Sequence, residues 1–180
     1  MTADDILEFW FSEESRARWF ASTPEYDRLV KDRFEATWRQ ACNGELDDWE
    51  ETAAGALALV IVLDQFPLNM FRNQAESFSS EEQSRQVARR AIGNGFDIEL
   101  ADEYMAFFYL PFMHSESLAD QDRSVMLFET AGLEDNLKWA RSHREIIRRF
   151  GRFPHRNKIL GRESTPEEIE WLNSEAGFNP

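Results

Sequence analysis

The apolar residues of the chain recur three or four positions apart, the spacing of α-helices, along most of its 180 residues. The spacing and the flanking cap residues predict about eight helices, over residues 4–11, 24–43, 52–66, 79–93, 98–110, 118–130, 134–150 and 166–177. No convincing pair of strands can be found. The sequence therefore predicts an all-α protein, a single domain over residues 1–180 with its helices in an up-and-down array.

Helix ends carry recognisable signals. Ser79 and Glu82 have the spacing of a capping box at the start of the fourth helix, and Gly151 follows the seventh at the C-cap position. Proline lacks the backbone N–H that a helix interior needs, so Pro67 and Pro111 are expected to end the third and fifth helices.

The third helix is apolar on nearly every side, which predicts a central position in the fold. Its longest apolar run, residues 56–63, is much shorter than the roughly 20 residues of a membrane span, so no membrane is expected. The N-terminus lacks the basic flank of a signal peptide, and Cys42 stands alone, so no intramolecular disulfide can form. Both observations favour a cytoplasmic location.

Long polar connections follow the third, fifth and seventh helices, whereas the other links are short. In an up-and-down array alternate helices run parallel, so these three connections would emerge at the same rim. Binding residues are commonly placed on such connections. We therefore predict a binding rim formed by the 64–72, 111–116 and 149–162 connections.

The first connection contains an acid in an unfavourable place. Asp64 lies on an apolar face near a helix C-terminus, where both burial and the helix dipole oppose a negative charge. It should pair with a cation, either Arg72 or an arginine of residues 149–162; a general base is the alternative. Gln65 and Asn69 could donate hydrogen bonds to a ligand or stabilise the turn.

The second connection holds His114 and Glu116, which could form an acid–base pair or part of a metal site. Their spacing is not that of a strong metal motif, so neither a metal nor a cofactor is predicted. His143 falls on the inward stripe of the seventh helix, which favours a hydrogen-bonded core histidine.

The third connection is basic in an acidic protein. The net charge is −14, yet eight Lys or Arg stand against Glu145 alone between Arg141 and Arg162. The net charge opposes nucleic-acid binding. The basic stretch could bind an anion, since arginine suits carboxylate or phosphate, or it could pair with acids of the same molecule. The candidate ligand-binding residues of this connection are Arg149, Arg152, His155, Arg156 and Asn157.

Two of the connections have similar sequences. "QFPLNMFR" (65–72) and "RFPHRNKILGR" (152–162) both have Phe-Pro, then Asn, then Arg, and Pro-Phe occurs at 111–112. This similarity suggests related helical hairpins in a divergent, repeat-like array.

Three segments together resemble a known family: "LALVIVLDQFPLNMFR", "YLPFMHSESLADQ" and "HREIIRRFGRFPHRNKILGRESTPEE". They are similar to the bacterial domain-of-unknown-function family nine hundred and twenty-four, and the likeness covers nearly the whole chain. The resemblance implies an all-helical fold similar to tetratricopeptide-repeat proteins and no established activity. Where that family commonly has Phe-Pro-Arg-Asn, this chain has Leu68, so any ligand contact of that arginine is missing.

The leading functional hypothesis is a tetratricopeptide-like domain that binds a peptide segment or a small anionic ligand at the rim. The alternative is an enzyme, a hydrolase or transferase, that acts on an anionic substrate there with one of four residues as the acid–base group: Asp64, His114, Glu116 or His155. In a third, structural hypothesis the polar residues only lock the helix ends. The abundant Trp and Phe leave room for a homodimer face.

Overall fold

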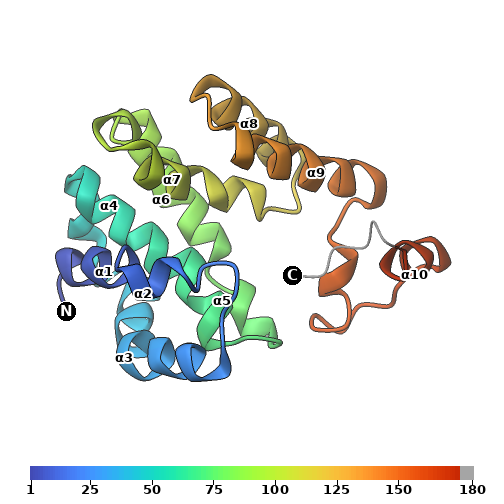
Figure 1. Ribbon diagram of the computed structural model, residues 1–180, viewed down its shortest axis with the longest axis horizontal. Helices are drawn as coiled ribbons and strands as arrows, with labels where there is room; N and C mark the ends of the chain where they lie inside the picture. The colour runs from blue at the N-terminus through green and yellow to red at the C-terminus, as the bar shows by residue number, and fades with distance from the viewer. Residues whose placement is uncertain (175–180) are drawn as a thin grey trace. The chain divides into compact units, whose positions relative to one another are not determined.

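The computed structural model describes residues 1–174 and confirms the all-α prediction, since no strand occurs in that part of the chain. Residues 175–177, predicted to end the last helix, lie outside it. The chain forms two compact units (Figure 1). Unit 1 comprises Met1–Arg72 and Glu76–Pro111, and unit 2 comprises Asn73–Ala75 and the chain from Phe112 onward. The predicted single domain and the predicted likeness to tetratricopeptide-repeat proteins stay predictions.

Unit 1 carries most of the helices. In chain order its elements are α1 (Ala3–Trp10), α2 (Glu13–Arg16), α3 (Pro24–Cys42), η1 (Asp47–Glu51), α4 (Ala53–Val60), η2 (Ile61–Gln65), α5 (Phe66–Met70), η3 (Ala75–Phe78), α6 (Glu81–Gly93), η4 (Asp97–Glu99) and α7 (Asp102–Met113). The first residue of η3 and the last two of α7 are counted with unit 2.

The elements α4, η2 and α5 follow one another without a break and form one rod, the central helix (53–70). Helices α1, α3 and α6 pack around it, as Figure 1 shows, so the predicted central position is confirmed. By length and composition Ala53–Met70 could cross a membrane, but 83% of that window is buried inside the structure, as in the core helix of a globular unit.

The prediction that Pro67 ends this helix is wrong. A π-helical turn, η2, precedes the proline, and the Phe66 N–H donates to the Ile61 carbonyl, five residues back. Pro67 has no N–H for the Leu63 carbonyl, but the Ser80 hydroxyl donates to that oxygen at 2.6 Å. The freed carbonyl is thus satisfied, and the helix continues to Met70.

Pro111 does not end its helix either, because α7 runs on to Met113. That helix also begins later than predicted, at Asp102, after the separate 3-10 turn η4. The second connection is therefore shorter than predicted and starts at His114.

The Ser80 hydroxyl has a second role that overturns the predicted capping box. It accepts a hydrogen bond of 2.9 Å from the Trp38 indole nitrogen of α3. Ser80 is the N-cap residue of α6 and makes no side-chain cap bond, while the Ser79 hydroxyl donates to the Glu76 carbonyl. A buried relay from Trp38 through Ser80 to Leu63 thus joins α3 and α6 to the central helix.

Unit 2 contains α8 (Leu118–Thr130), α9 (Glu134–Phe150), η5 (Pro154–Arg156) and α10 (Pro166–Leu172). Helices α8 and α9 lie side by side and antiparallel (Figure 1), joined by ion pairs of Arg141 with Glu129 and Arg144 with Asp122. Gly151 ends α9 with a left-handed φ of 70°, as predicted.

Beyond that glycine the chain returns to the core of unit 2. Phe153 and Trp171 pack there with Ile146 and Ile147 of α9. The basic connection is therefore anchored by apolar side chains rather than extended into solvent.

Replacing Ser80 with alanine tests the relay. Ser80→Ala leaves the Trp38 indole N–H and the Leu63 carbonyl buried without this partner, which should lower the free energy of unfolding by about 2–3 kcal/mol. Urea denaturation measures the change. Ser79→Ala, which removes only an exposed local bond, is the control. Equal stabilities for the two variants would contradict the role given to the relay.

Candidate functional site

The second and third predicted connections come together in unit 2 around the Glu116 carboxylate. Arg162 donates to both of its oxygens, at 2.7 and 2.9 Å, and the Phe153 N–H donates to one of them at 2.7 Å. The Arg156 guanidinium donates to the His114 carbonyl at 3.0 Å and lies over the Phe153 ring, 4.7 Å from its centroid. These contacts fix the path of the chain on both sides of η5.

A second carboxylate, that of Glu168, organises the start of α10. Its side chain is 2% exposed, and Arg152 donates to both of its oxygens at 2.7 and 2.8 Å. Asn157 and the Thr165 N–H donate to it as well, at 3.2 and 2.7 Å. The hydrogen bonds from Arg152, with those from Thr165 and Asn157, lower the pKa of Glu168 to about 2 in spite of its burial.

The remaining arginines of the basic stretch are also used inside unit 2. Arg148 pairs with Glu145 and Arg149 pairs with Glu167, each at 2.9 Å. Lys158 is exposed and makes no ion pair in the described part of the chain. The geometry therefore favours internal pairing, one of the two alternatives that the sequence left open.

The first predicted connection lies in unit 1, where most of it is helical rather than a loop. Arg72 does not pair with Asp64; it donates to both oxygens of Asp27 at 2.6 and 3.1 Å. The helix that continues through Pro67 explains this, because the six helical steps from Asp64 to Met70 rise about 9 Å and Arg72 lies in the turn beyond them. Asp64 is 1% exposed and accepts a hydrogen bond of 2.6 Å from the Gln65 amide.

Asn69 holds a helix start in unit 1 as Asn157 does in unit 2. Its amide donates to the Ser22 hydroxyl at 3.2 Å and to Asp27 at 2.7 Å, in the first turn of α3. The Asn157 amide likewise donates to the hydroxyl of Ser164 and to a carboxylate in the first turn of α10.

We call each of these two arrangements a clasp: Asn69 with Ser22 and Asp27 in unit 1, and Asn157 with Ser164 and Glu168 in unit 2. The clasps give the Phe-Pro similarity a structural counterpart, and the side chains of Asn69 and Asn157 have structural roles in them. A sequence signal for them exists that the motif analysis did not use, because "STPE" occurs at both 22–25 and 164–167.

Two of the candidate acid–base groups of unit 2, Glu116 and His155, and the core histidine His143 are poorly suited to proton transfer near pH 7. Burial lowers the pKa of His143 and of His155 to about 4, and His143 Nδ1 lies 2.9 Å from the Trp139 carbonyl. Burial raises the pKa of Glu116, but the hydrogen bonds from Arg162 and the Phe153 N–H outweigh it and leave that pKa lowered. Two neutral imidazoles and a firmly ionised carboxylate favour a structural role. The described residues contain no cluster of three metal-ligating side chains.

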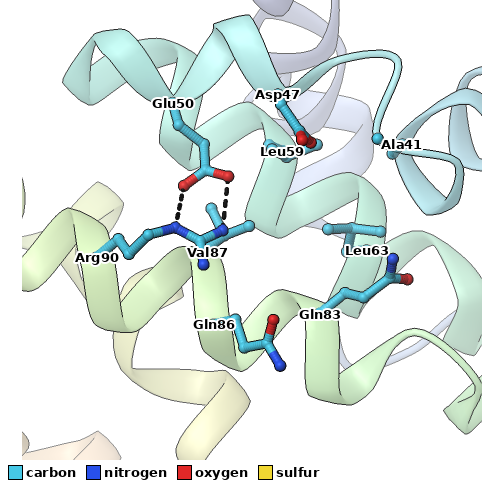
Figure 2. Close-up of a pocket in the computed structure, with 10 residues that line it drawn as sticks. Ala41, Asp47, Glu50, Leu59, Leu63, Gln83, Gln86, Val87 and Arg90 are labelled. Atoms are coloured by element: carbon cyan, nitrogen blue, oxygen red, sulfur yellow. Dashed lines mark hydrogen bonds and ion pairs between the residues drawn. The ribbon is translucent and has the colours of Figure 1, made fainter.

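A groove in unit 1 was missed by the sequence analysis. It encloses about 450 Å³ (Figure 2), and its lining comes from α3 and the following turn, η1, the central helix and α6: Ala41, Gly44, Asp47, Glu50, Leu59, Leu63, Gln83, Gln86, Val87 and Arg90. A signal was present, since Gln83, Gln86 and Arg90 recur at helical spacing and thus share one face of α6.

The groove has a polar rim above a floor of apolar residues that are at most 3% exposed. Leu59 and Leu63 of the central helix and Val87 of α6 form the floor. Figure 2 shows the Glu50–Arg90 ion pair across one part of the rim, with two nitrogen–oxygen distances of 2.6 and 2.7 Å. The Gln83 amide donates to the Cys42 carbonyl at 3.0 Å, so α6 is also fastened to the end of α3.

Comparisons with known proteins place the chain among proteins without an assigned activity. The family described as "Bacterial protein of unknown function (DUF924)" matches residues 6–176. The solved structure of a protein of unknown function from Agrobacterium tumefaciens is 42% identical, with a TM-score of 0.90 over 95% of this chain and 96% of that one. No curated protein matches.

The Arg152–Glu168 pair gives a stability prediction. Glu168→Gln should lower the free energy of unfolding, because it removes the charge that accepts from Arg152, Asn157 and the Thr165 N–H in a buried position. Glu167→Gln, one residue earlier, removes an exposed pair with Arg149 and should change it by less than about 1 kcal/mol. Chemical denaturation at pH 7 compares the two. A loss no larger for Glu168→Gln than for the control would refute the structural importance of this carboxylate.

Acidification should destabilise unit 2 through its histidines. The folded-state pKa of His143 is about 4, below its ordinary value of 6.5, so the unfolded chain binds the extra proton between these values. Stability should fall as the pH drops from about 6.5 to about 4, by up to about 3 kcal/mol for this group. The variant His143→Gln should show a shallower fall when unfolding is followed at pH 7, 6, 5 and 4.5. Equal slopes for the variant and the original chain would disprove the assignment.

Proposed function

Because the chain belongs to the bacterial family of unknown function DUF924, whose description gives no activity, we propose a function from the geometry: a binding module that holds an extended segment of a partner protein in the groove of unit 1. The observation that carries the proposal is the groove itself, an apolar floor between two polar walls on packed helices.

The size and the supports of the groove suit this role. A volume of about 450 Å³ lies within the range of about 300–1,000 Å³ that is usual for ligand pockets. Its floor belongs to the buried central helix, and its walls are tied together by the Glu50–Arg90 pair and the Gln83–Cys42 hydrogen bond. Such fixed walls lower the entropic cost of binding, because little has to be ordered when the ligand arrives.

The polar rim matches the needs of an extended backbone. A peptide segment without secondary structure has unpaired N–H and C=O groups, and a glutamine amide offers both a donor and an acceptor. Gln86 uses its N–H on Glu82 at 3.1 Å, and Gln83 uses its own on Cys42, so their carbonyl oxygens can accept from a peptide. Leu59 and Leu63 are almost fully buried, so a bound peptide would contact mainly the polar rim.

The anionic-ligand form of the rim prediction finds less support. A hollow of about 390 Å³ borders Arg149 and Arg152, but Glu167 and Glu168 line it too and pair with those arginines. An anion would have to displace them. The enzyme alternative also finds less support, because the pKa values of Glu116, His143 and His155 are all lowered and none of these three groups is suited to proton transfer near pH 7.

Several sequence-based expectations stay predictions beside this proposal. A tetratricopeptide-like array would suit it, since helical repeats form extended binding surfaces. The geometry of the groove tests neither the predicted cytoplasmic location nor the predicted homodimer.

The proposal is tested by filling the groove. Gln86 is exposed on α6, so Gln86→Trp should block the groove without disturbing the core. Gly93→Trp on the same helix is the matched control, because a side chain there meets nothing within 4 Å and lies outside the groove lining. Heptapeptides selected from a phage-displayed library on the full chain serve as probes, with affinities measured by calorimetry.

We expect the selected peptides to bind Gln86→Trp at least about tenfold more weakly and Gly93→Trp unchanged. A library that yields no binder, or binders that both variants hold equally well, would overturn the proposed function.

A further inference from the structure

One carboxylate of the groove, that of Asp47, makes no direct ion pair in the described part of the chain, although after Glu50 it also raises the pKa of Arg90. Asp47 and Glu50 both line it, three residues apart on η1. Glu50 uses both oxygens on Arg90, whereas Asp47 makes no ion pair among residues 1–174. The charged residues that line the groove therefore carry one negative charge in excess.

The position of Asp47 adds to this negative potential. Gly44 follows α3 with a left-handed φ of 76°, and a Cβ atom there would lie 3.3 Å from Asp47 Oδ2. The carboxylate thus lies against the C-terminal end of α3, the negative end of that helix dipole, where a cation is favoured. The first turn of η1 favours an acid at position 47 but supplies no cation for it.

The charge of unit 1 acts in the same direction. Met1–Arg72 and Glu76–Pro111 contain 22 Asp or Glu against 10 Lys or Arg, a net charge of −12, whereas the rest of the chain carries −2. The acidity of the protein is therefore concentrated in the unit that holds the groove. A field of this sign accelerates the approach of a basic partner and repels an acidic one.

The floor beside Asp47 is apolar. Asp47, Leu59 and Leu63 all line the groove, and Figure 2 labels each of them. A Lys or Arg side chain fits such a place, because its aliphatic stem can cover apolar surface while its charged end reaches a carboxylate.

We infer that the segment held in the groove is basic and places a Lys or Arg side chain on Asp47. This inference rests on the proposed function and adds the class of partner to it. The partner would then supply the direct ion pair that Asp47 does not make among residues 1–174.

Three acetylated and amidated pentapeptides test the inference: Leu-Lys-Leu-Lys-Leu and its analogues with Gln or Glu in place of both Lys. Backbone-amide chemical shifts of the isotope-labelled full chain report where each binds and how tightly. Asp47→Asn removes the unpaired charge, and Asp48→Asn makes the same change at the next residue, which does not line the groove.

The Lys peptide should bind more tightly than the Glu peptide by at least tenfold and shift the amides of Gln83, Gln86 and Val87. Asp47→Asn should weaken the Lys peptide about fivefold and leave the Gln peptide unchanged, while Asp48→Asn should have little effect. Equal weakening by both substitutions would show that only the general field of unit 1 acts.

Equal binding of the Lys and Gln peptides in the groove would overturn the inference and leave the proposed function standing. If none of the three peptides shifts the groove amides and the selected heptapeptides do not either, both are wrong.

Discussion

The hydrogen bond that the Leu63 carbonyl accepts from Ser80 is the interaction on which unit 1 depends. Without a partner for that carbonyl, Pro67 would end the helix where it frees the oxygen. With the partner, the central helix continues to Met70, supplies the groove floor and carries Asn69 to the first turn of α3. The same hydroxyl accepts from Trp38, so one side chain couples the proline to both flanking helices.

The all-α fold and most helix bounds were predictable, because they rest on local signals. The apolar periodicity of residues 118–130 and the left-handed Gly151 are signals of this kind, and both were interpreted correctly. The errors at Pro67 and Pro111 have another origin. Whether a proline breaks a helix depends on what satisfies the freed carbonyl, and in the first case that partner is Ser80, 17 residues away from Leu63.

The candidate site was predictable only in part, again for reasons of distance along the chain. The sequence predicted that Glu116 and the basic stretch lie at the same rim. In the structure Glu116 forms an ion pair with Arg162 of that stretch. The sequence could not decide whether the arginines pair internally, since their partners Glu167 and Glu168 come from α10. The groove needs α3, η1, the central helix and α6 at once, and no single stretch of sequence contains it.

The two units divide the charge of the protein in a way that the total of −14 conceals. In unit 2 the arginines stabilise helix starts and connections, and they form ion pairs with nearby acids. In unit 1 the acids outnumber the bases, and Asp47 makes no direct ion pair among residues 1–174. The clasps at Asn69 and Asn157 are a similar structural device in both units, so the units differ in their charge balance rather than in the clasps.

The most direct test of the central claim is a crystal structure of the full chain with a selected heptapeptide bound. We expect an extended peptide in the groove of unit 1, with a basic side chain on Asp47 and its backbone along Gln83 and Gln86. A peptide bound instead at the arginines of residues 149–162, with their ion pairs opened, would contradict it.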